Sequence, residues 1–281
     1  HIATIVLRDQ ILMFWHVSVM LWSAMCRTYW SIRSPLKEMK TMPIIEVYNN
    51  YSSLGILSRP ITYGEEFEMV QRFIDYKKNS FKEQGNKQLA IFVETKINDA
   101  YPDVIFAEYD PSKYERWNNS RSKLSSADLK LLYYLYTKNN ATSKTIITDL
   151  SIHYKTLLQS LEALLDAGLI SRSNECWSVL NREDIFSVNK IEAVEAKINK
   201  WDIVMQQAIL NKSFASESFV LSKCKKEPKN DIVKRINSFG IGIYLFDDYH
   251  FSRIVKAKRS RFPSNYNSVY LNECIGRILN A

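Results

Sequence analysis

The sequence is poor in glycine, proline, cysteine and histidine, and each shortage argues against a class of protein. Seven Gly and seven Pro in 281 residues exclude a collagen-like chain and a broadly disordered one. No segment repeats with a period of 20–50 residues, which argues against solenoids and propellers. The four cysteines are Cys26, Cys176, Cys224 and Cys274. They form no CxxC pair and have no histidine nearby, so we expect no structural zinc site and interpret them as small buried residues in a reducing compartment.

A long apolar run is also missing. The longest is Ile11–Cys26, which two polar residues interrupt and which is shorter than the roughly 20 residues of a transmembrane helix. Three interpretations stay open for it: a membrane anchor or signal-like segment, a helix packed on the protein, or an extension upstream of a natural start at Met39 or Met42. We favour the extension, and assign residues 1–43 to it.

Positive charge is in excess. The chain carries 38 Lys and Arg against 30 Asp and Glu, a net charge of +8 with a pI of about 9.1. Such an excess favours a polyanionic partner, because each neutralised phosphate releases condensed counterions. A membrane surface would attract the same charge, but we expect nucleic acid. The 46% of hydrophobic and 24% of charged residues are typical of a globular protein, which we expect in the cytoplasm.

From Ile44 the pattern is that of a mixed α/β protein. Amphipathic periodicity predicts helices, and short runs of β-branched and aromatic residues predict strands. The expected elements are helices over 64–78 and 201–214 and strands over 89–94, 103–109, 190–198, 218–221 and 242–246. The strands over 89–94 and 103–109 are expected to pair with each other. Residues 44–125 form the first part of this core, ending in a polar linker, and residues 183–281 form the second part.

Residues 126–182 differ in style and are predicted to be an all-α insert. Three helices are expected over 126–138, 143–150 and 153–167, the last ended by Gly168, and then a small hairpin. Three helices followed by a hairpin is the order of a winged helix. The segment 163–170 (ALLDAGLI) resembles the end of the recognition helix of that family, which implies DNA binding by a helix–turn–helix.

The strand over 190–198 places an acid and a lysine together. Successive side chains of a strand alternate between faces, so Val194 and Ala196 face a core while Glu195 and Lys197 share the other face. Charges on an apolar strand must be paired or bind metal. If the strand that begins at Asp103 is its neighbour, Asp103 and Glu195 are able to share a divalent ion, and hard oxygen ligands suit Mg²⁺.

These residues resemble the two halves of a known signature. Pro102-Asp103 at a strand start and Glu195-Ala196-Lys197 on an apolar strand are similar to the PD-(D/E)XK nuclease superfamily. The resemblance implies a restriction-endonuclease-like core, with a central mixed sheet flanked by helices, and Mg²⁺ or Mn²⁺ as cofactor. Asp103 and Glu195 lie 92 residues apart, further than the family's single hairpin, and the insert accounts for the excess.

The resemblance implies two further site residues. Several lineages place a glutamine on the helix after the E-x-K strand, and Gln207 is the matching residue, expected on one apolar face with Ile203, Leu210 and Phe214. The aromatic that often accompanies this glutamine is replaced here by Asn211.

The first helix of the family often supplies one more acid. Glu66 fits by its facing, although Glu65 and Glu68 are also available.

Plainer interpretations stand beside these. Glu195 and Lys197 also fit an exposed cross-strand ion pair, Asp103 a strand-start aspartate, and Gln207 a buried amide satisfied by the backbone. The third helix of the insert offers Lys155 and Gln159 to a major groove, or it contacts protein.

The C-terminal basic run is a better candidate for phosphate contacts, or it is a solvated tail. Its residues are Arg253, Lys256, Lys258, Arg259 and Arg261.

We therefore expect a Mg²⁺- or Mn²⁺-dependent DNA endonuclease in which Asp103, Glu195, Lys197 and Gln207 are catalytic and Asp103, Glu195 and Glu66 hold the metal. DNA is the expected partner. A homodimer stays open, and no small-molecule cofactor is expected. The first alternative is a DNA-binding regulator or interaction protein with a silent core. The second is an interaction protein held on a membrane by the apolar N-terminal run.

Overall fold

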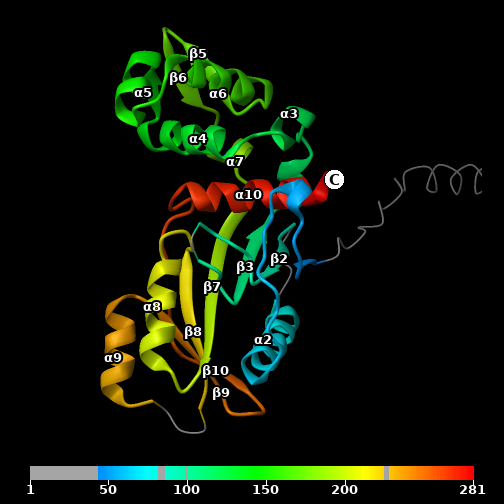
Figure 1. Cartoon of the computed structure of the whole chain (residues 1–281), viewed down its shortest axis with the longest axis vertical. Coiled ribbons are helices and arrows are strands. Elements are labelled where there is room, and N and C mark those ends of the chain that lie inside the picture. Colours follow the sequence, from blue (N-terminus) through cyan, green and yellow to red (C-terminus); the bar gives the residue numbers. More distant parts are fainter. Residues whose placement is uncertain (1–43, 82–85, 99, 225–227) are drawn as a thin grey trace, which may run out of the picture. The chain divides into compact units, whose positions relative to one another are not determined.

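A central mixed sheet flanked by helices organises the chain (Figure 1). The computed structural model describes residues 44–81, 86–98, 100–224 and 228–281. The N-terminal extension, including the apolar run at 11–26, lies outside the described residues. Within the described part, no helix is both long and apolar enough to cross a lipid bilayer. Residues 44–281 form one compact unit.

Seven strands make the sheet, in the order β1-β2-β3-β7-β8-β9-β10. They are β1 (Ile45–Val47), β2 (Gln88–Val93), β3 (Val104–Tyr109), β7 (Val188–Ile198), β8 (Glu217–Lys223), β9 (Gly242–Phe246) and β10 (Phe251–Val255). The pairs β2–β3, β3–β7 and β9–β10 are antiparallel, and β1–β2, β7–β8 and β8–β9 are parallel. The predicted pairing of the strands over 89–94 and 103–109 is confirmed, because β2 and β3 are neighbours.

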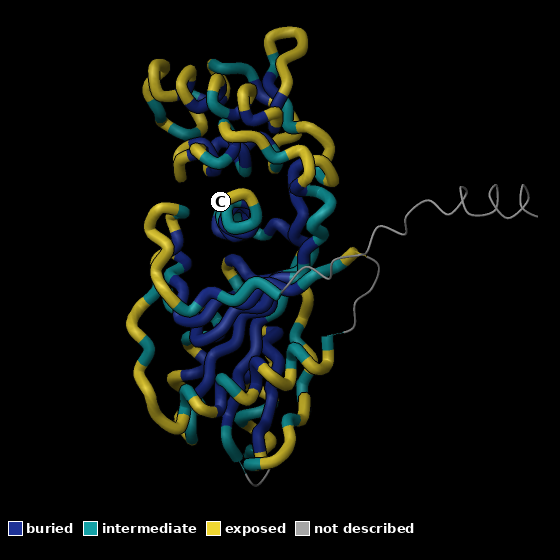
Figure 2. The backbone as a smooth tube through the Cα atoms, turned by 90° about the vertical axis from the view of Figure 1, so that its right-hand side faces the viewer, coloured by how far each residue is buried: buried dark blue, intermediate teal, exposed yellow. Residues whose placement is uncertain are grey.

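Helices cover both faces of the sheet, and the strands between them are buried (Figure 2). One face packs on α2 (Glu65–Ser80), through a cluster that includes Phe73, Phe106 and Val194. The other face packs on α8 (Trp201–Asn211) and α9 (Asn230–Ser238). Burial on both faces explains why these strands are nearly continuous apolar runs.

The segment predicted as an insert has its own small sheet. It contains α4 (Ser126–Lys138), α5 (Ser143–Leu150) and α6 (Tyr154–Asp166), and a three-stranded antiparallel sheet of β4 (Asn140–Thr142), β5 (Ile170–Ser173) and β6 (Cys176–Val179). The order of three helices and then a hairpin is confirmed. The expectation of an all-α insert was wrong, because β4 between α4 and α5 adds a third strand to the hairpin.

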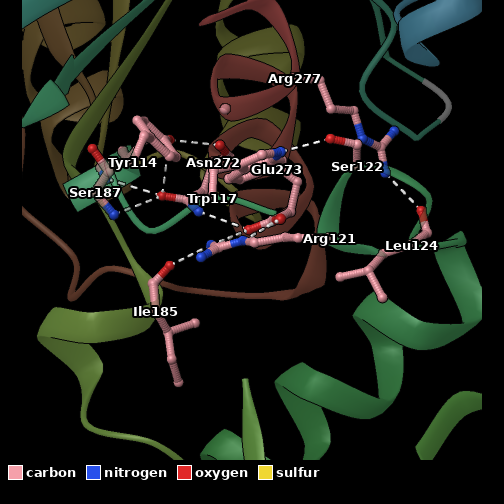
Figure 3. A network of polar contacts seen from close by, with 12 residues as sticks. Tyr114, Trp117, Arg121, Ser122, Leu124, Ile185, Ser187, Asn272, Glu273 and Arg277 are labelled. Atoms are coloured by element: carbon pink, nitrogen blue, oxygen red, sulfur yellow. Dashed lines mark hydrogen bonds and ion pairs between the residues drawn. The ribbon is translucent and has the colours of Figure 1, made fainter. Parts of the chain in front are cut away.

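A polar network joins both ends of this segment to the last helix, α10 (Tyr266–Leu279) (Figure 3). Arg121, in the short helix α3 (Asn119–Ser122), donates from Nε and Nη2 to the carboxylate of Glu273 at 2.9 and 2.7 Å, and from Nη2 to the carbonyl of Ile185 at 2.6 Å. Ile185 ends α7 (Arg182–Ile185), which follows the hairpin. One buried ion pair therefore connects the entry and the exit of the segment.

Asn272 extends the network to the start of β7. Its side-chain oxygen accepts from the backbone N–H groups of Ser187 and Val188 at 2.9 and 3.0 Å, and its backbone carbonyl accepts from the hydroxyl of Tyr114 at 2.6 Å (Figure 3). The Tyr114 side chain belongs to the one-turn helix η2 (Pro111–Tyr114). The polar linker predicted over 110–125 is thus anchored on α10.

One smaller expectation needs correction. Of the cysteines, Cys274 is buried on α10, but Cys176 and Cys224 are only half-buried, because each lies near the end of a strand at the edge of its cluster. No element was predicted after residue 246, and the structure adds α10 there, a largely buried helix whose inner face carries Asn272 and Glu273.

Candidate active site

Antiparallel pairing of β3 and β7 brings the two predicted acids together. The register pairs Val104 with Val194 and Ile105 with Ala193, and its continuation sets Asp103 opposite Glu195. In such pairs the Cβ atoms are about 4.5–5.5 Å apart. The sequence-based site required these two strands to be neighbours, and they are.

Asp103 is 6% exposed, and both of its carboxylate oxygens have donors. Oδ2 accepts from the backbone N–H of Ala196 at 2.7 Å, and Oδ1 accepts from Nη2 of Arg59 at 3.1 Å. The first bond locks the start of β3 to β7.

Glu195 is 2% exposed and only half satisfied. Its Oε1 accepts from the side-chain amide of Asn211 at 2.8 Å, across from α8. Its Oε2 is buried and has no hydrogen-bond partner in the described part of the chain. An unsatisfied buried carboxylate oxygen is costly, and this oxygen is able to accept a further ligand.

Lys197 and Glu66 form the third part of the site. The Nζ of Lys197 donates to Oε2 of Glu66 at 2.8 Å, and Oε1 of Glu66 lies 3.4 Å from the backbone N–H of Ile198. Glu66 lies in the first turn of α2, so the helix start approaches the end of β7. Of the three acids in the first turn of this helix, Glu65 instead pairs with Lys223 at 2.6 Å.

Two charged residues of the site were missed in the sequence. Arg59 precedes α2 and contacts both Asp103 and Glu94, the latter through a short Nε–Oε2 bond. Glu94 follows β2 with a φ of 52°, in the left-handed region that non-glycine residues seldom adopt. The one sequence signal for Glu94 was its position, as an acid directly after the buried strand residues 89–93. No local pattern marks Arg59, because it lies in an irregular segment.

Burial is the largest cause of a raised pKa at both Glu195 and Asp103. Burial raises the pKa of Glu195 well above its usual range, the charge of Asp103 adds to this, and the amide of Asn211 opposes it. Burial also raises the pKa of Asp103, against the opposing charges of Lys197 and Arg59. Two adjacent buried acids whose pKa values are both raised form an arrangement that a cation would relieve.

Burial alone would lower the pKa of Lys197. The charges of Asp103, Glu66 and Glu195 outweigh this effect, so its pKa is raised and the ammonium stays charged.

A cleft of about 460 Å³ lies between the start of α2 and the strand ends that carry Glu94, Asp103 and Lys197. Glu195 does not belong to its lining and is buried behind it. The charged lining of the cleft consists of Arg59, Glu65, Glu66, Glu94, Asp103 and Lys197. Tyr63, Phe67 and Val70 form an apolar side. Tyr63 is largely exposed, and its ring stands edge-on to Phe67 at 5.5 Å. The cleft thus combines a charged side, with four acids and two bases, and an apolar side that includes the exposed ring of Tyr63.

The helix after β7 is rotated relative to the sequence-based expectation. Ile203 and Leu210 were expected on the buried face, but they are 50% and 62% exposed. The buried face of α8 consists of Val204, Met205, Ala208 and Asn211. The predicted stripe was therefore wrong, since polar Asn211 belongs to the face that packs on the sheet.

Gln207 lies one helical turn before Asn211. Its Oε1 is buried and has no hydrogen-bond partner in the described part of the chain. The structure brings Asn211, and not Gln207, into contact with Glu195.

The expected three-carboxylate metal set is not assembled in this arrangement. Among the described residues, no three His, Cys, Asp or Glu side chains are grouped so that they could hold a metal ion. Glu66 is turned to Lys197, and Arg59 occupies one oxygen of Asp103. The pair formed by Asp103 and Glu195 is what remains for a cation.

The predicted nucleic-acid-binding residues are all exposed. Lys155 and Gln159 lie on the outer side of α6. The C-terminal basic residues begin in β10 and continue into the extended segment after it: Arg253, Lys256, Lys258, Arg259 and Arg261. None of these side chains belongs to an ion pair within the described residues.

Comparisons with protein-family models, with curated proteins and with solved structures found no match to this chain.

Proposed function

We propose that this protein is a metal-dependent nuclease of the PD-(D/E)XK type that hydrolyses phosphodiester bonds of DNA. The observation that carries the proposal is the buried pair Asp103 and Glu195, adjacent on two strands with Lys197 beside them and one oxygen of Glu195 unsatisfied. A single cross-strand ion pair, the plainer interpretation of Glu195 and Lys197, does not account for that oxygen, because Lys197 pairs with Glu66.

The residues fit a magnesium or manganese ion. Mg²⁺ is usually held by one or two carboxylates, with water and substrate phosphate completing its ligands, and Asp103 and Glu195 provide the two. When bound, such an ion lowers the pKa of the attacking water and polarises the phosphate. The elevated carboxyl pKa values agree with a site that is incomplete without a cation.

The chain's own residues have separate roles in this proposal. Lys197 orients the attacking water, or offsets the charge that develops on the phosphorane. Glu66 holds the ammonium of Lys197 through its 2.8 Å bond, and Asn211 fixes the carboxylate of Glu195. Gln207, one turn from Asn211, stays a candidate for a contact within the site. Because Asp103 and Glu195 are both buried, little bulk water reaches their carboxylates.

The order of elements around the acids also supports the proposal. Asp103 directly precedes β3, Glu195 and Lys197 lie in the antiparallel neighbour β7, and α8 and the parallel strand β8 follow. This is the context that the family signature requires. Residues 126–182 are proposed to be its winged-helix insert, with α6 as the recognition helix and β5–β6 as the wing.

The decisive experiment is cleavage of a mixed pool of plasmid, linear, single-stranded and branched DNA in Mg²⁺ or Mn²⁺. Lys197→Ala is expected to lower the rate by about 10²–10³-fold. Lys223→Ala is the matched control, since this lysine lies on the adjacent strand and pairs with Glu65 outside the acid pair. Equal rates for wild type and Lys197→Ala, or no cleavage by the wild type, would reject the nuclease.

A second function is favoured by one observation. Arg59 takes the place of a cation at Asp103, as expected of a silent core in a DNA-binding regulator or interaction protein. In addition, α6 exposes Tyr154, Leu158 and Leu165, which suits a protein contact better than a major groove. Sequence-specific DNA binding, or capture of a defined protein by α6, without cleavage would support this function.

A further inference from the structure

A second hollow, of about 400 Å³, lies at the other end of β7. Its lining consists of Arg182, Asn189, Arg259, Ser260, Arg261 and Phe262. The three arginines come from two distant parts of the chain, the start of α7 and the segment before α10. No acidic residue is among them. We call this hollow the arginine pocket.

Neutral acceptors hold two of these arginines. The Nε and Nη2 of Arg182 each lie 3.4 Å from the carbonyl oxygen of Phe262, and the Phe262 ring lies 5.9 Å from the guanidinium. Arg259 contacts the carbonyl of Asn189 at 3.5 Å. Backbone carbonyls orient a guanidinium but leave its charge uncompensated, which distinguishes these arginines from Arg121, whose charge Glu273 neutralises.

The backbone around the arginine pocket is well fixed. Phe262 is buried and its ring stands edge-on to Phe186 at 5.7 Å, and the N–H of Ser260 donates to the carbonyl of Ser216 at 2.7 Å. Guanidinium groups on a fixed backbone lose less freedom when a ligand binds.

The surrounding charge indicates the ligand. Residues 256–261 hold four Lys and Arg and no acid. Residues 126–182, in contrast, hold six Lys and Arg against five Asp and Glu. Residues 183–281, which include the basic run at the arginine pocket, hold 16 Lys and Arg against 11 Asp and Glu, a net charge of +5, whereas the segment with α6 has a net charge of only +1.

We propose that the arginine pocket binds a backbone phosphate of nucleic acid and is a principal source of its sequence-independent affinity. Arg182 and Arg261 contact the phosphate oxygens, and Arg259 supports them from the Asn189 side. Arg182 is new to this role, because in the sequence it lies 77 residues before Arg259. The inference needs nucleic-acid binding from the proposed function, but not hydrolysis.

The arginine pocket and the candidate active site hold different phosphates. Asn189 and Glu195 are six residues apart on one strand, roughly 20 Å at about 3.3 Å per residue. Loss of the arginine pocket is therefore expected to weaken binding and to leave the hydrolytic step of the bound complex unchanged.

The test is the fluorescence anisotropy of labelled 20-base-pair duplexes of two unrelated sequences, titrated in EDTA over a range of salt concentrations. Arg182→Gln with Arg261→Gln is expected to weaken binding of both duplexes about 10–100-fold at low salt. It should also reduce the slope of log K against log[salt] by about 0.9, because the contact with one phosphate is lost. Lys234→Gln with Arg235→Gln is the control, since it removes two exposed positive charges on α9; a change below about twofold is expected.

Unchanged affinity and slope in the first double variant, or an equal loss in the control, would overturn the inference. Circular dichroism and thermal unfolding establish that each variant is folded. The outcome is separable from the nuclease proposal. If binding depends on the arginine pocket but the wild type never cleaves, only the nuclease fails. If the wild type cleaves and the variant binds normally, only the arginine pocket fails.

Discussion

Asn211 and Glu195 lie on different elements, and the amide of Asn211 donates to one oxygen of Glu195 at 2.8 Å while the other oxygen has no partner in the described part of the chain. Both side chains are almost inaccessible to water, so water cannot replace this hydrogen bond if it is lost. The amide offsets part of the cost of a buried charge. It also leaves one carboxylate oxygen for a ligand, and the next predictions concern this relationship and its neighbours.

Asn211→Ala is expected to destabilise the fold by about 1–3 kcal/mol, because it leaves a buried carboxylate without its donor. It should also raise the pKa of Glu195 further, since the amide now opposes that rise. Urea unfolding measures the first effect. Gln206→Ala, an exposed amide on the same helix, is the control and should change stability by less than about 0.5 kcal/mol. Equal stability of the two variants would contradict the role of Asn211.

Glu195→Gln is expected to flatten the dependence of stability on pH. In the folded chain the pKa of Glu195 is raised above its ordinary value of 4.5, so the folded state binds more protons than the unfolded one above that pH. Stability therefore falls as the pH rises from about 4.5 through the folded pKa. The variant has no carboxylate at this position and so does not lose this stability. At pH 8 in EDTA its Tm should exceed that of wild type by about 2–4 °C for each 1 kcal/mol by which the charged Glu195 destabilises the wild type. A parallel pair of Tm–pH curves would be inconsistent with the raised pKa.

Arg59→Ala is expected to tighten Mn²⁺ binding about tenfold, which corresponds to 1.4 kcal/mol. The guanidinium contacts Asp103 and Glu94 and would repel a cation there. Isothermal titration calorimetry measures the affinity without any activity assay. Arg72→Ala serves as control, because this exposed arginine contacts the carbonyl of Asp248 instead. An affinity for Mn²⁺ no tighter than that of wild type would show that Arg59 does not compete for Asp103.

Glu273→Ala is expected to destabilise the chain by about 3–5 kcal/mol, since it leaves Arg121 buried and uncompensated. The same change removes an anchor between α10 and the segment that contains α4–α6 (Figure 3). Chemical denaturation followed by far-UV circular dichroism gives the free energy of unfolding. Asp202→Ala breaks an exposed pair with Arg235, and its effect should stay below about 1 kcal/mol. A similar cost for both variants would show that burial of the Arg121 pair has no effect.

Local periodicity predicted the first helix and five of the seven strands of the central sheet, and it missed the edge strands β1 and β10. The run over 190–198 shows the alternation that places Glu195 and Lys197 apart from the core side chains Val194 and Ala196. Such signals are readable because they depend only on neighbours in the chain. The side of α2 on which Glu66 lies was predictable for the same reason.

Helix α10 shows where local signals fail. Its buried face carries Asn267, Ser268, Asn272 and Glu273, polar residues that interrupt any apolar stripe. Asn272 and Glu273 are buried because Arg121, Tyr114 and the backbone at 187–188 supply their partners. Those partners lie more than 80 residues away in sequence, so a short stretch of sequence around α10 does not reveal why its polar face is buried.

The sequence by itself determined the α/β class, the alternating strand with Glu195 and Lys197, and the strand start at Asp103, because hydrophobic periodicity and residue type are local properties. Only the tertiary structure decided that Arg59 occupies Asp103, that Glu66 turns to Lys197, and that Asn211 contacts Glu195. Each of these contacts joins distant segments. Its partner is selected by strand register, by the rotation of a helix about its axis and by the need to satisfy a buried charge, which are properties of the packed chain.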